Sequence, residues 1–585
     1  MKKFIILLYI LALTLPATAG EAPGFKVGTY NLYTSGSRRD ILQKDTTVSP
    51  QRYWCHSAGA VGDMIVHLDC DIIGLQEICD SIWNGPRNIR DIVAAKGGDY
   101  RWILYPNSPK NTISFDDAIG YKPSVFDCLE SGIFWLGGVL DKPETAPGIY
   151  KGWKRPAVWG RFLHKVSGKE FYFISTHLLV PMKRPDGTMD YEGNRYNAQQ
   201  LRKWCEENLP DDVPAILVGD MNVDIDGRTW NTLAQVPFMD TKLYFLRSDR
   251  MSEDARKWGT QNVKNESRLT KWYPDHIMVQ GFRPLDYVID RSRFATDDGS
   301  LHYPSDHLPL TSHVVFIDYS PSGLPTPPKA KKTVRTMSFN IRYHNNNVDL
   351  ENGWAMRRRA IPAMLEDVQP DVFGTQEITD IQIAYLDRRC PDYKHVGIFR
   401  EPDGKKECAS LYYNSNFVDL LDWGGFHLSE TPSVPSLGWD GAVKRTAVWA
   451  RLRMKDSKKE FIFVTTHLDH KGQEARTKGL DLILDTLSVI NKGKLPCVLV
   501  GDLNMTEDNP ALVRLSGEMK NARETAVSSD DRYSFNGFGQ SWTGNIDYIW
   551  YKGFKKCTDF KVVTRKYLHI NYISDHYPIR ADLQL

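Results

Sequence analysis

Short apolar runs that end in polar residues recur along this chain. Residues 25–32, 71–77, 171–178 and 215–222 follow this pattern, and their last positions include Asn, Gln-Glu, Thr-His and Gly-Asp-x-Asn. Apolar runs of this length, bounded by turn residues, are typical of buried β-strands. Because strand ends along one edge of a sheet bring their side chains together, the pattern predicts a polar site at such an edge.

The rest of the first half predicts many short strands and few long helices. Helical patterns occupy residues 58–68 and 197–208. Aromatic-rich strands with Gly and Pro turns fill residues 100–165, and two more strands are expected at 285–289 and 310–317. A chain in which strands outnumber long helices favours sheets packed face to face with helices outside, which is an α/β (α+β) class.

The same series of patterns starts again in the second half. Its blocks lie, in the same order, at residues 334–340, 371–377, 425–428, 445–449, 460–468, 497–504, 546–549 and 574–576. A repeat unit of this size indicates a duplicated domain rather than a short-period solenoid repeat. We expect one domain over residues 20–319 and a second over 333–585. A Pro- and Lys-rich stretch at 320–332 predicts an extended, semi-rigid linker between them.

The first 19 residues predict a secretory signal peptide. Lys2 and Lys3 precede an apolar run over residues 4–15, which leads into Pro16-Ala17-Thr18-Ala19. The small residues suit cleavage after Ala19, and the apolar run is shorter than the ~20 residues that a membrane span needs. No cysteine follows the cleavage position, which disfavours a lipid anchor. We expect a periplasmic or secreted protein whose mature chain has no transmembrane segment.

Composition indicates a soluble globular protein of two or more domains. The 585 residues are 41% apolar and 25% charged, and this length exceeds one ordinary core. The 74 Lys and Arg residues include Lys2 and Lys3, so the mature chain balances its 72 Asp and Glu residues and has no overall basic footprint. The nine cysteines show no CxxC spacing, which disfavours a zinc cluster. Pairing of Cys390 with Cys408, or of Cys55 with Cys79, is left open.

Six motifs recur in both halves in one order. In the second half they are Phe339-Asn340, Gln376-Glu377, Thr466-His467, Gly501-Asp502-Leu503-Asn504, Ile546-Asp547-Tyr548 and Ser574-Asp575-His576. In the first half they are Tyr30-Asn31, Gln76-Glu77, Thr176-His177, Gly219-Asp220-Met221-Asn222, Leu285-Asp286-Tyr287 and Ser305-Asp306-His307. With these motifs, both halves resemble the endonuclease/exonuclease/phosphatase superfamily. The resemblance implies two tandem four-layer α/β sandwiches of the deoxyribonuclease I-like type and hydrolysis of phosphate esters.

The resemblance also implies a metal site in each half. Carboxylates and a carboxamide, without clustered cysteines, suit a hard divalent ion such as Mg²⁺, with Mn²⁺ or Ca²⁺ as substitutes. Such an ion would neutralise charge that develops on the phosphate and steady the leaving group. The implied ligands are Glu77, Asn31 and Asp306 in the first half and Glu377, Asn340 and Asp575 in the second.

Other motif residues receive catalytic roles from the same resemblance. The acids of the Gly-Asp-x-Asn motifs, Asp220 and Asp502, would orient or deprotonate the attacking water. The Asn residues of these motifs, Asn222 and Asn504, would hold a phosphate oxygen. They lie two positions after the acids and therefore on the same face of an extended segment. The histidines of the last motifs would work with an acid that fixes the ring; these pairs are His307 with Asp286 and His576 with Asp547. The candidates for a general acid or transition-state donor are His177 and His467, and the candidates for a phosphate contact are Arg155 and Arg445.

Each motif also has a structural interpretation without chemistry. An Asn at a strand end is usually a turn former, an Asp-His pair is often a surface pair, and Gly-Asp-x-Asn is equally compatible with a β-turn. The joint occurrence of the motifs, in order and twice, favours the functional interpretation. We therefore expect an exported, divalent-metal-dependent phosphodiesterase or phosphatase with two sites. The alternatives are a secreted endo- or exonuclease on DNA or RNA, and a bivalent, non-catalytic protein that binds phosphate ligands.

The expected partner is a phosphate-ester substrate, which could be a small molecule, a lipid head group or a nucleic acid; no protein partner is expected. The neutral charge balance favours smaller or lipid-linked substrates over DNA. The two halves differ around their motifs. The first half has an insertion at residues 180–194 where the second has only residues 469–473, and the second half carries a basic run at 357–359 that predicts either a phosphate contact or a solvated helix start.

Overall fold

The computed structural model describes most of the chain. The described residues are 23–33, 54–78, 82, 85, 87–104, 116–138, 146, 154–209, 213–224, 229, 233, 238–246, 251, 253–261, 271–317, 325–329, 332–404, 407–539, 544–568 and 570–585. The chain divides into two compact units: the first ends at Ile317, and the second holds the residues that follow together with Pro237–Met239 and Leu243–Leu246. The predicted signal peptide at residues 1–19 lies outside the described part of the chain.

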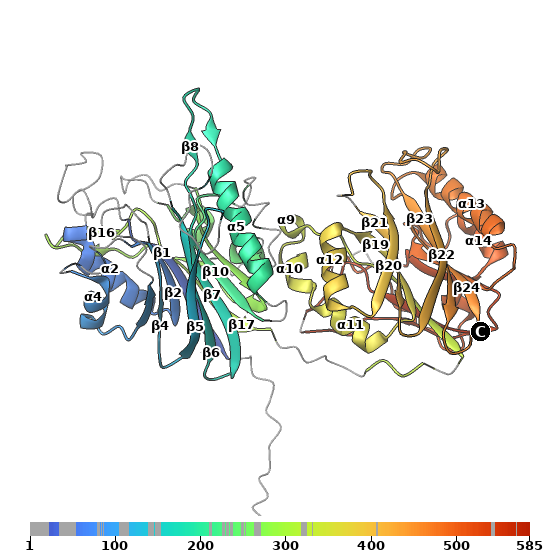
Figure 1. Cartoon of the computed structure of the whole chain (residues 1–585), viewed down its shortest axis with the longest axis horizontal. Coiled ribbons are helices and arrows are strands. Elements are labelled where there is room, and N and C mark those ends of the chain that lie inside the picture. The colour runs from blue at the N-terminus through green and yellow to red at the C-terminus, as the bar shows by residue number, and fades with distance from the viewer. Residues whose placement is uncertain are drawn as a thin grey trace, which may run out of the picture. The chain divides into compact units, whose positions relative to one another are not determined.

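The first unit is built on two sheets (Figure 1). The seven-stranded sheet has the order β13 (Phe282–Pro284), β17 (Leu310–Phe316), β1 (Gly24–Asn31), β2 (Ile72–Ile78), β4 (Asp116–Tyr121) and β3 (Arg101–Leu104), with β14 (Val288–Ile289) also paired to β17. The six-stranded sheet has the order β11 (Met239–Asp240), β12 (Asp275–Gln280), β10 (Ala215–Asp220), β7 (Lys169–His177), β6 (Pro156–His164) and β5 (Phe126–Trp135). Two short pairs complete the described strands: β8 (Met182–Lys183) with β9 (Met189–Asp190), and β15 (Phe294–Ala295) with β16 (Leu301–His302).

The second unit repeats this plan with two six-stranded sheets. One has the order β20 (Tyr393–Phe399), β21 (Cys408–Asn414), β19 (Val372–Ile378), β18 (Thr333–Asn340), β29 (Ile579–Gln584) and β28 (Lys556–Val562). The other has the order β22 (Val418–His427), β23 (Thr446–Met454), β24 (Glu460–His467), β25 (Cys497–Asp502), β27 (Asp547–Lys552) and β26 (Lys520–Asn521).

Helices flank the sheets in each unit. In the first unit they are α2 (Trp54–Leu68), α4 (Ile89–Ala95), α5 (Glu192–Asn208), α7 (Thr241–Phe245) and α8 (Glu253–Lys257). In the second they are α9 (Asn346–Asp349), η3 (Leu350–Asn352), α10 (Trp354–Arg357), α11 (Ala360–Val368), α12 (Asp380–Arg389), α13 (Gln473–Ile490), α14 (Leu512–Glu518) and α15 (Ala522–Thr525). The predicted helices at 58–68 and 197–208 are confirmed, and both begin a few residues earlier than expected.

Apolar side chains explain the layers. Between the two sheets of the second unit, Val372 and Leu411 of one sheet join Val448, Phe463 and Val500 of the other in a single buried cluster. Outside, the helices α13 and α14 cover the second sheet, as α2 covers the outer face of the first sheet in the first unit. Figure 1 shows helices on both outer sides of the paired sheets in each unit. The predicted tandem four-layer α/β sandwich is confirmed.

The same strand register holds in both units. The strands β1 and β2 run parallel with Asn31 opposite Gln76, and β18 and β19 run parallel with Asn340 opposite Gln376. The pairs β7/β10 and β24/β25 are also parallel, and each ends with a His opposite an Asp. Parallel neighbours end at the same sheet edge, so the register places the predicted polar ends together.

Three expectations about the rest of the chain meet the structure here. Cys390 and Cys408 are both free thiols, so their suggested pairing is wrong; the side chains of Cys55 and Cys79 lie outside the described residues. Within the described residues, every helix is too short or too polar to span a membrane. The strand expected over 285–289 is confined to Val288–Ile289.

Part of the expected linker is bonded to the second unit. The Thr326 backbone N–H and hydroxyl both donate to the Asp367 carboxylate, at 3.0 and 2.8 Å, and Lys329 forms an ion pair with the buried Asp371. An Arg335 guanidinium N–H donates to the carbonyl of Pro327. Residues 325–329, which belong to the predicted extended, semi-rigid linker, are therefore held against the second unit.

Candidate functional site

The candidate site of each unit lies where the two sheets present their strand ends. In the first unit, the Asn31 amide Nδ2, at the end of one sheet, donates to Asp220 Oδ2, at the end of the other, over 3.0 Å. In the second unit, Asn340 Nδ2 donates to Asp502 Oδ2 over 2.9 Å. All four side chains are buried. One hydrogen bond thus joins the facing sheets at the site, in the same way in both units.

The same Asn side chains reach the motif glutamates. Asn31 Nδ2 lies 3.2 Å from Glu77 Oε1, and Asn340 Nδ2 lies 3.1 Å from Glu377 Oε1. Each Asn Oδ1 accepts the backbone N–H two residues further on, at 3.0 Å, which fixes the orientation of the amide. The amide nitrogen therefore faces the carboxylates and the oxygen faces away. In this orientation the Asn31 and Asn340 amides hold the glutamate carboxylates in place, and their metal ligation stays a prediction.

A buried polar ladder supports these strand ends from behind. The Thr29 hydroxyl donates to Gln76 Oε1, and Gln76 Nε2 donates to the Ser175 hydroxyl in the facing sheet, at 3.0 and 3.1 Å. In the second unit Ser338, Gln376 and Thr465 form the equivalent ladder. The sequence analysis matched these Gln residues as part of a motif without assigning them a role. Each Gln directly precedes the motif Glu, and this position was the signal from which a role at the site could have been predicted.

The Gly-Asp-x-Asn motifs form a turn and also belong to the site. Each strand ends at the Asp, and the following Asn has a left-handed backbone, with φ of 52° at Asn222 and 51° at Asn504. The Asn backbone N–H donates to the Asp Oδ1 over 2.9 Å in both units. The expectation that Asp and Asn share one face of an extended segment is therefore wrong. The turn instead places each Asn amide beside a histidine: Asn222 Nδ2 lies 3.0 Å from His177 Nε2 and donates to the carbonyl of Leu178.

The histidine of the last motif is held by a buried acid. In the second unit His576 Nδ1 lies 2.8 Å from Asp547 Oδ2, as expected. In the first unit His307 Nδ1 lies 2.8 Å from Asp275 Oδ2, so the expected pairing with Asp286 is wrong. Asp286 instead bonds His313, a half-exposed residue on the sheet surface.

Strand register explains this correction. The strand β12 runs antiparallel to β10 with Asp275 opposite Asp220, and β27 runs antiparallel to β25 with Asp547 opposite Asp502. Asp275 and Asp547 are thus equivalent positions in space. The residues around Asp286 resemble those around Asp547 in sequence but do not occupy the equivalent position in the sheet.

A second histidine in each site is paired with an arginine. Arg445 Nη1 lies 2.8 Å from His467 Nδ1, and Arg155 Nη1 lies 3.3 Å from His177 Nδ1. A guanidinium can only donate, so each Nδ1 is an acceptor and the ring carries its proton on Nε2. In both units this Nε2 lies 3.4 Å from Oδ2 of the central aspartate. Arg155 and Arg445 therefore orient a histidine in this structure, and their contact with phosphate stays a prediction.

Burial and neighbouring charges set the protonation states. Burial raises the pKa of Asp220 and of Asp502 to about 7, despite the opposing effect of the nearby histidines. Burial alone would lower the pKa of His576, but Asp547 and Asp502 outweigh it and raise that pKa to about 10. The pKa of His307 is raised for the same reason. Burial and the adjacent arginines lower the pKa of His177 and His467. Each site thus pairs one charged and one neutral histidine around an aspartate.

This geometry agrees with the comparison to known protein families. The family model described as "Endonuclease/Exonuclease/phosphatase family" matches residues 28–321 and 337–576. The chain belongs to this family. As a member it is a phosphoesterase, and the two matches confirm the tandem duplication. No curated protein gave a significant match.

Solved structures of this family resemble one unit's length of the chain. A Bacteroides thetaiotaomicron mannosyl-6-phosphatase is 28% identical, with a TM-score of 0.40, and the match covers 43% of this chain and 100% of that one. A Bacteroides vulgatus endonuclease/exonuclease/phosphatase is 32% identical, with a TM-score of 0.41, over 44% of this chain and 100% of that one. The human Nocturnin catalytic domain is 22% identical, with a TM-score of 0.35, over 43% and 93%.

Oxygen donors suitable for the family's divalent metal lie in both sites. Ligand atoms of Glu377, His467 and Asp502 lie within 4.8 Å of one another, and so do those of Asp220, Asp275 and His307. Burial alone would raise the pKa of Glu377, but Arg342 and His576 outweigh it and lower that pKa, so the carboxylate is ionised. Carboxylate oxygens with few soft ligands fit a hard divalent cation.

The basic run of the second half is buried and holds the backbone of the loop after β18, next to the site. Arg357, Arg358 and Arg359 are all buried, at 0, 5 and 8% exposure, so the expected solvated helix start is wrong. The Arg357 guanidinium donates to the carbonyls of Ile341, Arg342 and Tyr343, in the loop after β18. Arg357 therefore fixes backbone rather than contacting phosphate.

The insertion of the first half forms a hairpin ahead of α5. The strands β8 and β9 pair with each other and lie apart from both sheets. Figure 1 shows the hairpin labelled β8 extending beyond the end of the first unit's sheets. Beyond it, Asn194 of α5 donates to the carbonyls of Leu179 and Met221, next to His177 and Asp220 in sequence. The insertion therefore connects directly to the site.

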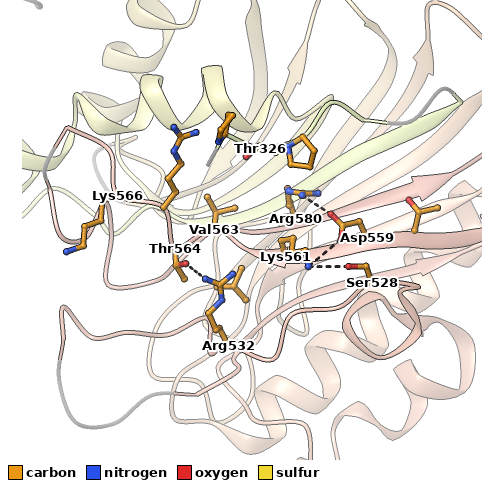
Figure 2. A pocket seen from close by; sticks show the side chains of 14 residues that line it. Thr326, Ser528, Arg532, Asp559, Lys561, Val563, Thr564, Lys566 and Arg580 are labelled. Carbon is orange, nitrogen blue, oxygen red and sulfur yellow. Dashed lines mark hydrogen bonds and ion pairs between the residues drawn. The ribbon is translucent and has the colours of Figure 1, made fainter. Parts of the chain in front are cut away.

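Two hollows of the second unit differ in their relation to the site. A small one is lined by the site residues Glu377, Arg445 and His467 together with Arg400, Glu407 and Lys444. A larger cavity of about 840 Å³ lies beside β28 (Figure 2). Four of its five cations form ion pairs: Arg580 and Lys561 with Asp559, Arg532 with Asp530, and Arg565 with Asp367. The fifth, Lys566, donates to Asn571 Oδ1. We therefore place the chemistry at the strand ends.

Proposed function

We propose that the chain is an exported, divalent-metal-dependent phosphoesterase with one active site in each half. The observation that carries this proposal is the buried aspartate of each unit, Asp220 or Asp502. One charged and one neutral histidine and two Asn side chains surround it in the same geometry. A duplicated domain that had lost its function would not be expected to keep this whole arrangement twice.

The metal would be held by the glutamate at one strand end and the acid of the last motif. These residues are Glu77 and Asp306 in the first unit and Glu377 and Asp575 in the second. When bound, Mg²⁺ at this position would neutralise charge on the phosphate and assist the leaving group. The Asn31 and Asn340 amides, which donate to the glutamates, keep those carboxylates in place.

The buried aspartate would act as the general base for the attacking water. Its pKa of about 7 lies near neutral pH, where a base is both partly free and able to take a proton. Its Oδ1 accepts the backbone N–H of Asn222 or Asn504, and its Oδ2, which accepts the Asn31 or Asn340 amide, faces the two histidines. Removal of the water proton by this oxygen would start the in-line displacement at phosphorus.

The two histidines would stabilise the phosphate in different ways. His307 or His576, charged and held by Asp275 or Asp547, would attract the phosphate oxygens. His177 or His467, neutral with a proton on Nε2, would donate a hydrogen bond from that atom to the phosphate or the leaving oxygen. The Asn222 and Asn504 amides, next to this atom, would share the same phosphate oxygen.

Export remains part of the proposal and rests on the sequence alone. The basic, apolar and small-residue order of residues 2–19 supports removal of a signal peptide after Ala19. Mass spectrometry of the protein recovered from its native compartment should give a chain that starts at Gly20. A chain that keeps residues 1–19 would contradict export by cleavage.

The decisive experiment combines substrates, metal and a double variant. Wild-type protein should hydrolyse p-nitrophenyl phosphate or bis(p-nitrophenyl) phosphate with Mg²⁺, and a chelator should abolish the activity. The variant Glu77→Gln/Glu377→Gln should lose about 10³-fold or more, since both metal sites lose a carboxylate. Plasmid DNA and RNA in the same panel, at low and high salt, test for nuclease activity.

The matched control is Glu206→Gln/Glu474→Gln. Both of these glutamates are half-exposed helix residues in i,i+4 ion pairs away from the site. The control should keep wild-type activity. Activity that survives the chelator, or that survives in the site double variant, would overturn the proposed function.

A further inference from the structure

One backbone position next to the glutamate carries different side chains in the two sites. Tyr33 and Arg342 both follow the site Asn by two residues, and both N–H groups donate to its Oδ1 over 3.0 Å. Both residues also have a left-handed backbone, with φ of 64° and 57°. The two side chains therefore start from equivalent places. One is a neutral phenol and the other a cation.

Arg342 directs its charge at the carboxylates of the second site. Its Nη1 lies 3.8 Å from Glu377 Oε2 and 3.7 Å from Asp575 Oδ2. These are the two acids to which we assign the metal. No such cation stands at position 33 of the first site.

The guanidinium is held in place yet reachable. Asp349 accepts its Nη2 over 2.9 Å, and the ring of Tyr343 lies against it at 4.5 Å. Arg357 bonds the carbonyls of Arg342 and Tyr343, which fixes the backbone that carries it. The Arg342 side chain keeps 20% of its surface exposed. Arg342 is therefore a preorganised, partly exposed cation beside the site carboxylates.

The charge of the substrate decides what such a cation would do. A phosphomonoester carries close to two negative charges at neutral pH, because its second pKa is about 6, whereas a diester carries one. A fixed guanidinium favours the ion with more charge and more free oxygens. A site without this cation stabilises the second negative charge of a monoester less.

We propose that Arg342 makes the second site selective for phosphomonoesters, and that the first site, with Tyr33 at that position, acts on phosphodiesters. This inference rests on the proposed phosphoesterase function and specifies its substrates. At the first site, water would form a bond to phosphorus, one ester bond would break and the released alcohol would take a proton. The product is a monoester, which the second site would hydrolyse in the same way to inorganic phosphate and a second alcohol. The two halves would then act in sequence on one phosphodiester.

The test follows the products of bis(p-nitrophenyl) phosphate in the full-length protein with Mg²⁺. Wild-type protein should release two p-nitrophenols and one inorganic phosphate per diester. Glu377→Gln, which leaves the first site, should release one p-nitrophenol and accumulate p-nitrophenyl phosphate. Glu77→Gln, which leaves the second site, should hydrolyse p-nitrophenyl phosphate and act slowly on the diester.

Substitutions at the two positions test the role of the cation itself. In the Glu77→Gln background, Arg342→Gln should lower kcat/KM for the monoester about 10-fold to 100-fold more than for the diester, as expected for loss of a charged hydrogen bond. Arg342→Lys should recover part of that loss. In the Glu377→Gln background, Tyr33→Arg should raise the monoester-to-diester ratio. Thermal melting of each variant identifies any that fail to fold, and the remaining variants decide the question.

The outcomes separate this inference from the function on which it rests. If each single-site variant is active but both show the same monoester-to-diester ratio, or if the first site prefers the monoester, the assignment of substrates is overturned. The phosphoesterase function would still stand in that case. If wild-type protein hydrolyses neither ester, the proposed function itself is overturned.

Discussion

Four site residues have a backbone conformation that their side chains disfavour. Glu77 and Glu377 have φ of 60° and 62°, and Asn222 and Asn504 have φ of 52° and 51°. A left-handed residue other than glycine costs about 1–2 kcal/mol, with Asn the better tolerated. At each glutamate the strand register also shifts between the glutamate's neighbours, at Leu75/Ile78 and Thr375/Ile378. The left-handed backbone occurs at equivalent positions in both halves. We therefore attribute it to the need to direct the glutamate carboxylate and the Asn amide into the site.

At the residue scale, the acid that holds His307 is the sharpest prediction. In a Glu377→Gln background, which leaves only the first site, Asp275→Asn should lower kcat/KM about 10²-fold or more. The neutral amide cannot keep His307 charged and oriented, and a positioned charged donor is worth about that much. Steady-state kinetics with bis(p-nitrophenyl) phosphate measures the effect.

Asp286→Asn in the same background is the matched control. The Asp286 carboxylate bonds the half-exposed His313, away from His307, so its replacement should leave kcat/KM within about 2-fold of the parent. Equal losses in the two variants would show that the His307–Asp275 bond has no role in catalysis.

Motif order located most of the site before the structure did, and Asp275 shows where this failed. Leu285-Asp286-Tyr287 matches the letters of Ile546-Asp547-Tyr548, while Asp275 is followed by His276. The separation along the chain was the better signal: His307 lies 32 residues from Asp275, and His576 lies 29 residues from Asp547. The arginine contacts to His467 and His177 could not be predicted, because the sequence does not show which side chains of neighbouring strands lie on the same face of the sheet.

At the element scale, the strand β12 carries a buried charged pair that the second unit lacks at the equivalent position. His276 Nδ1 lies 2.7 Å from Asp240 Oδ2, and its Nε2 lies 2.8 Å from the carbonyl of Val223. Both ring nitrogens face acceptors, so the ring is doubly protonated. At the equivalent position of β27, Tyr548 donates its hydroxyl to the carbonyl of Met505.

This pair predicts a pH-dependent stability for the first unit. Burial lowers the pKa of His276, but Asp240 and the carbonyl of Val223 outweigh it, so the folded pKa lies above 6.5. A raised pKa stabilises the fold fully below pH 6.5, and this stabilisation is lost as pH rises through the folded value. The free energy of unfolding of the first unit, followed by denaturant titration from pH 6 upwards, should therefore fall with pH.

The variant Asp240→Asn separates this pair from other titrating groups. It should destabilise the first unit by about 3 kcal/mol at pH 6, because it leaves a buried His without its counter-ion. It should also flatten the fall with pH, since the raised pKa depends on the Asp240 charge. A wild-type slope that persists unchanged in Asp240→Asn would assign the pH dependence to another group.

Strands and their polar ends could be predicted because apolar runs and turn residues are local signals. The role of the basic run could not. Arg357, Arg358 and Arg359 have the composition of a solvated helix start, yet the fold buries all three and uses Arg357 to bond three backbone carbonyls. A buried arginine is identified only by the acceptors around it, and those come from residues 341–343 in another element.

At the scale of the whole molecule, duplication was evident from the order of the motifs, while the exact limit between the units was not. Residues 325–329 have a linker composition but bond Asp367, Asp371 and Arg335 of the second unit. Pro-rich segments have few backbone donors, so their docking depends on a few polar contacts that composition does not reveal.

The last prediction concerns the independence of the two sites. Asn31, Glu77, Asp220, Asp275 and His307 are bonded to one another within the first unit, and their counterparts are bonded within the second. Two sites without shared partners turn over substrate independently, so their rates add. With p-nitrophenyl phosphate at saturating Mg²⁺, the rates of Glu77→Gln and Glu377→Gln should therefore sum to the wild-type rate within about 20%, whatever the preference of each site. Loss of the whole rate in each of the two single variants would mean that both glutamates serve one active site, because a rate carried by two independent sites must survive in at least one of the variants.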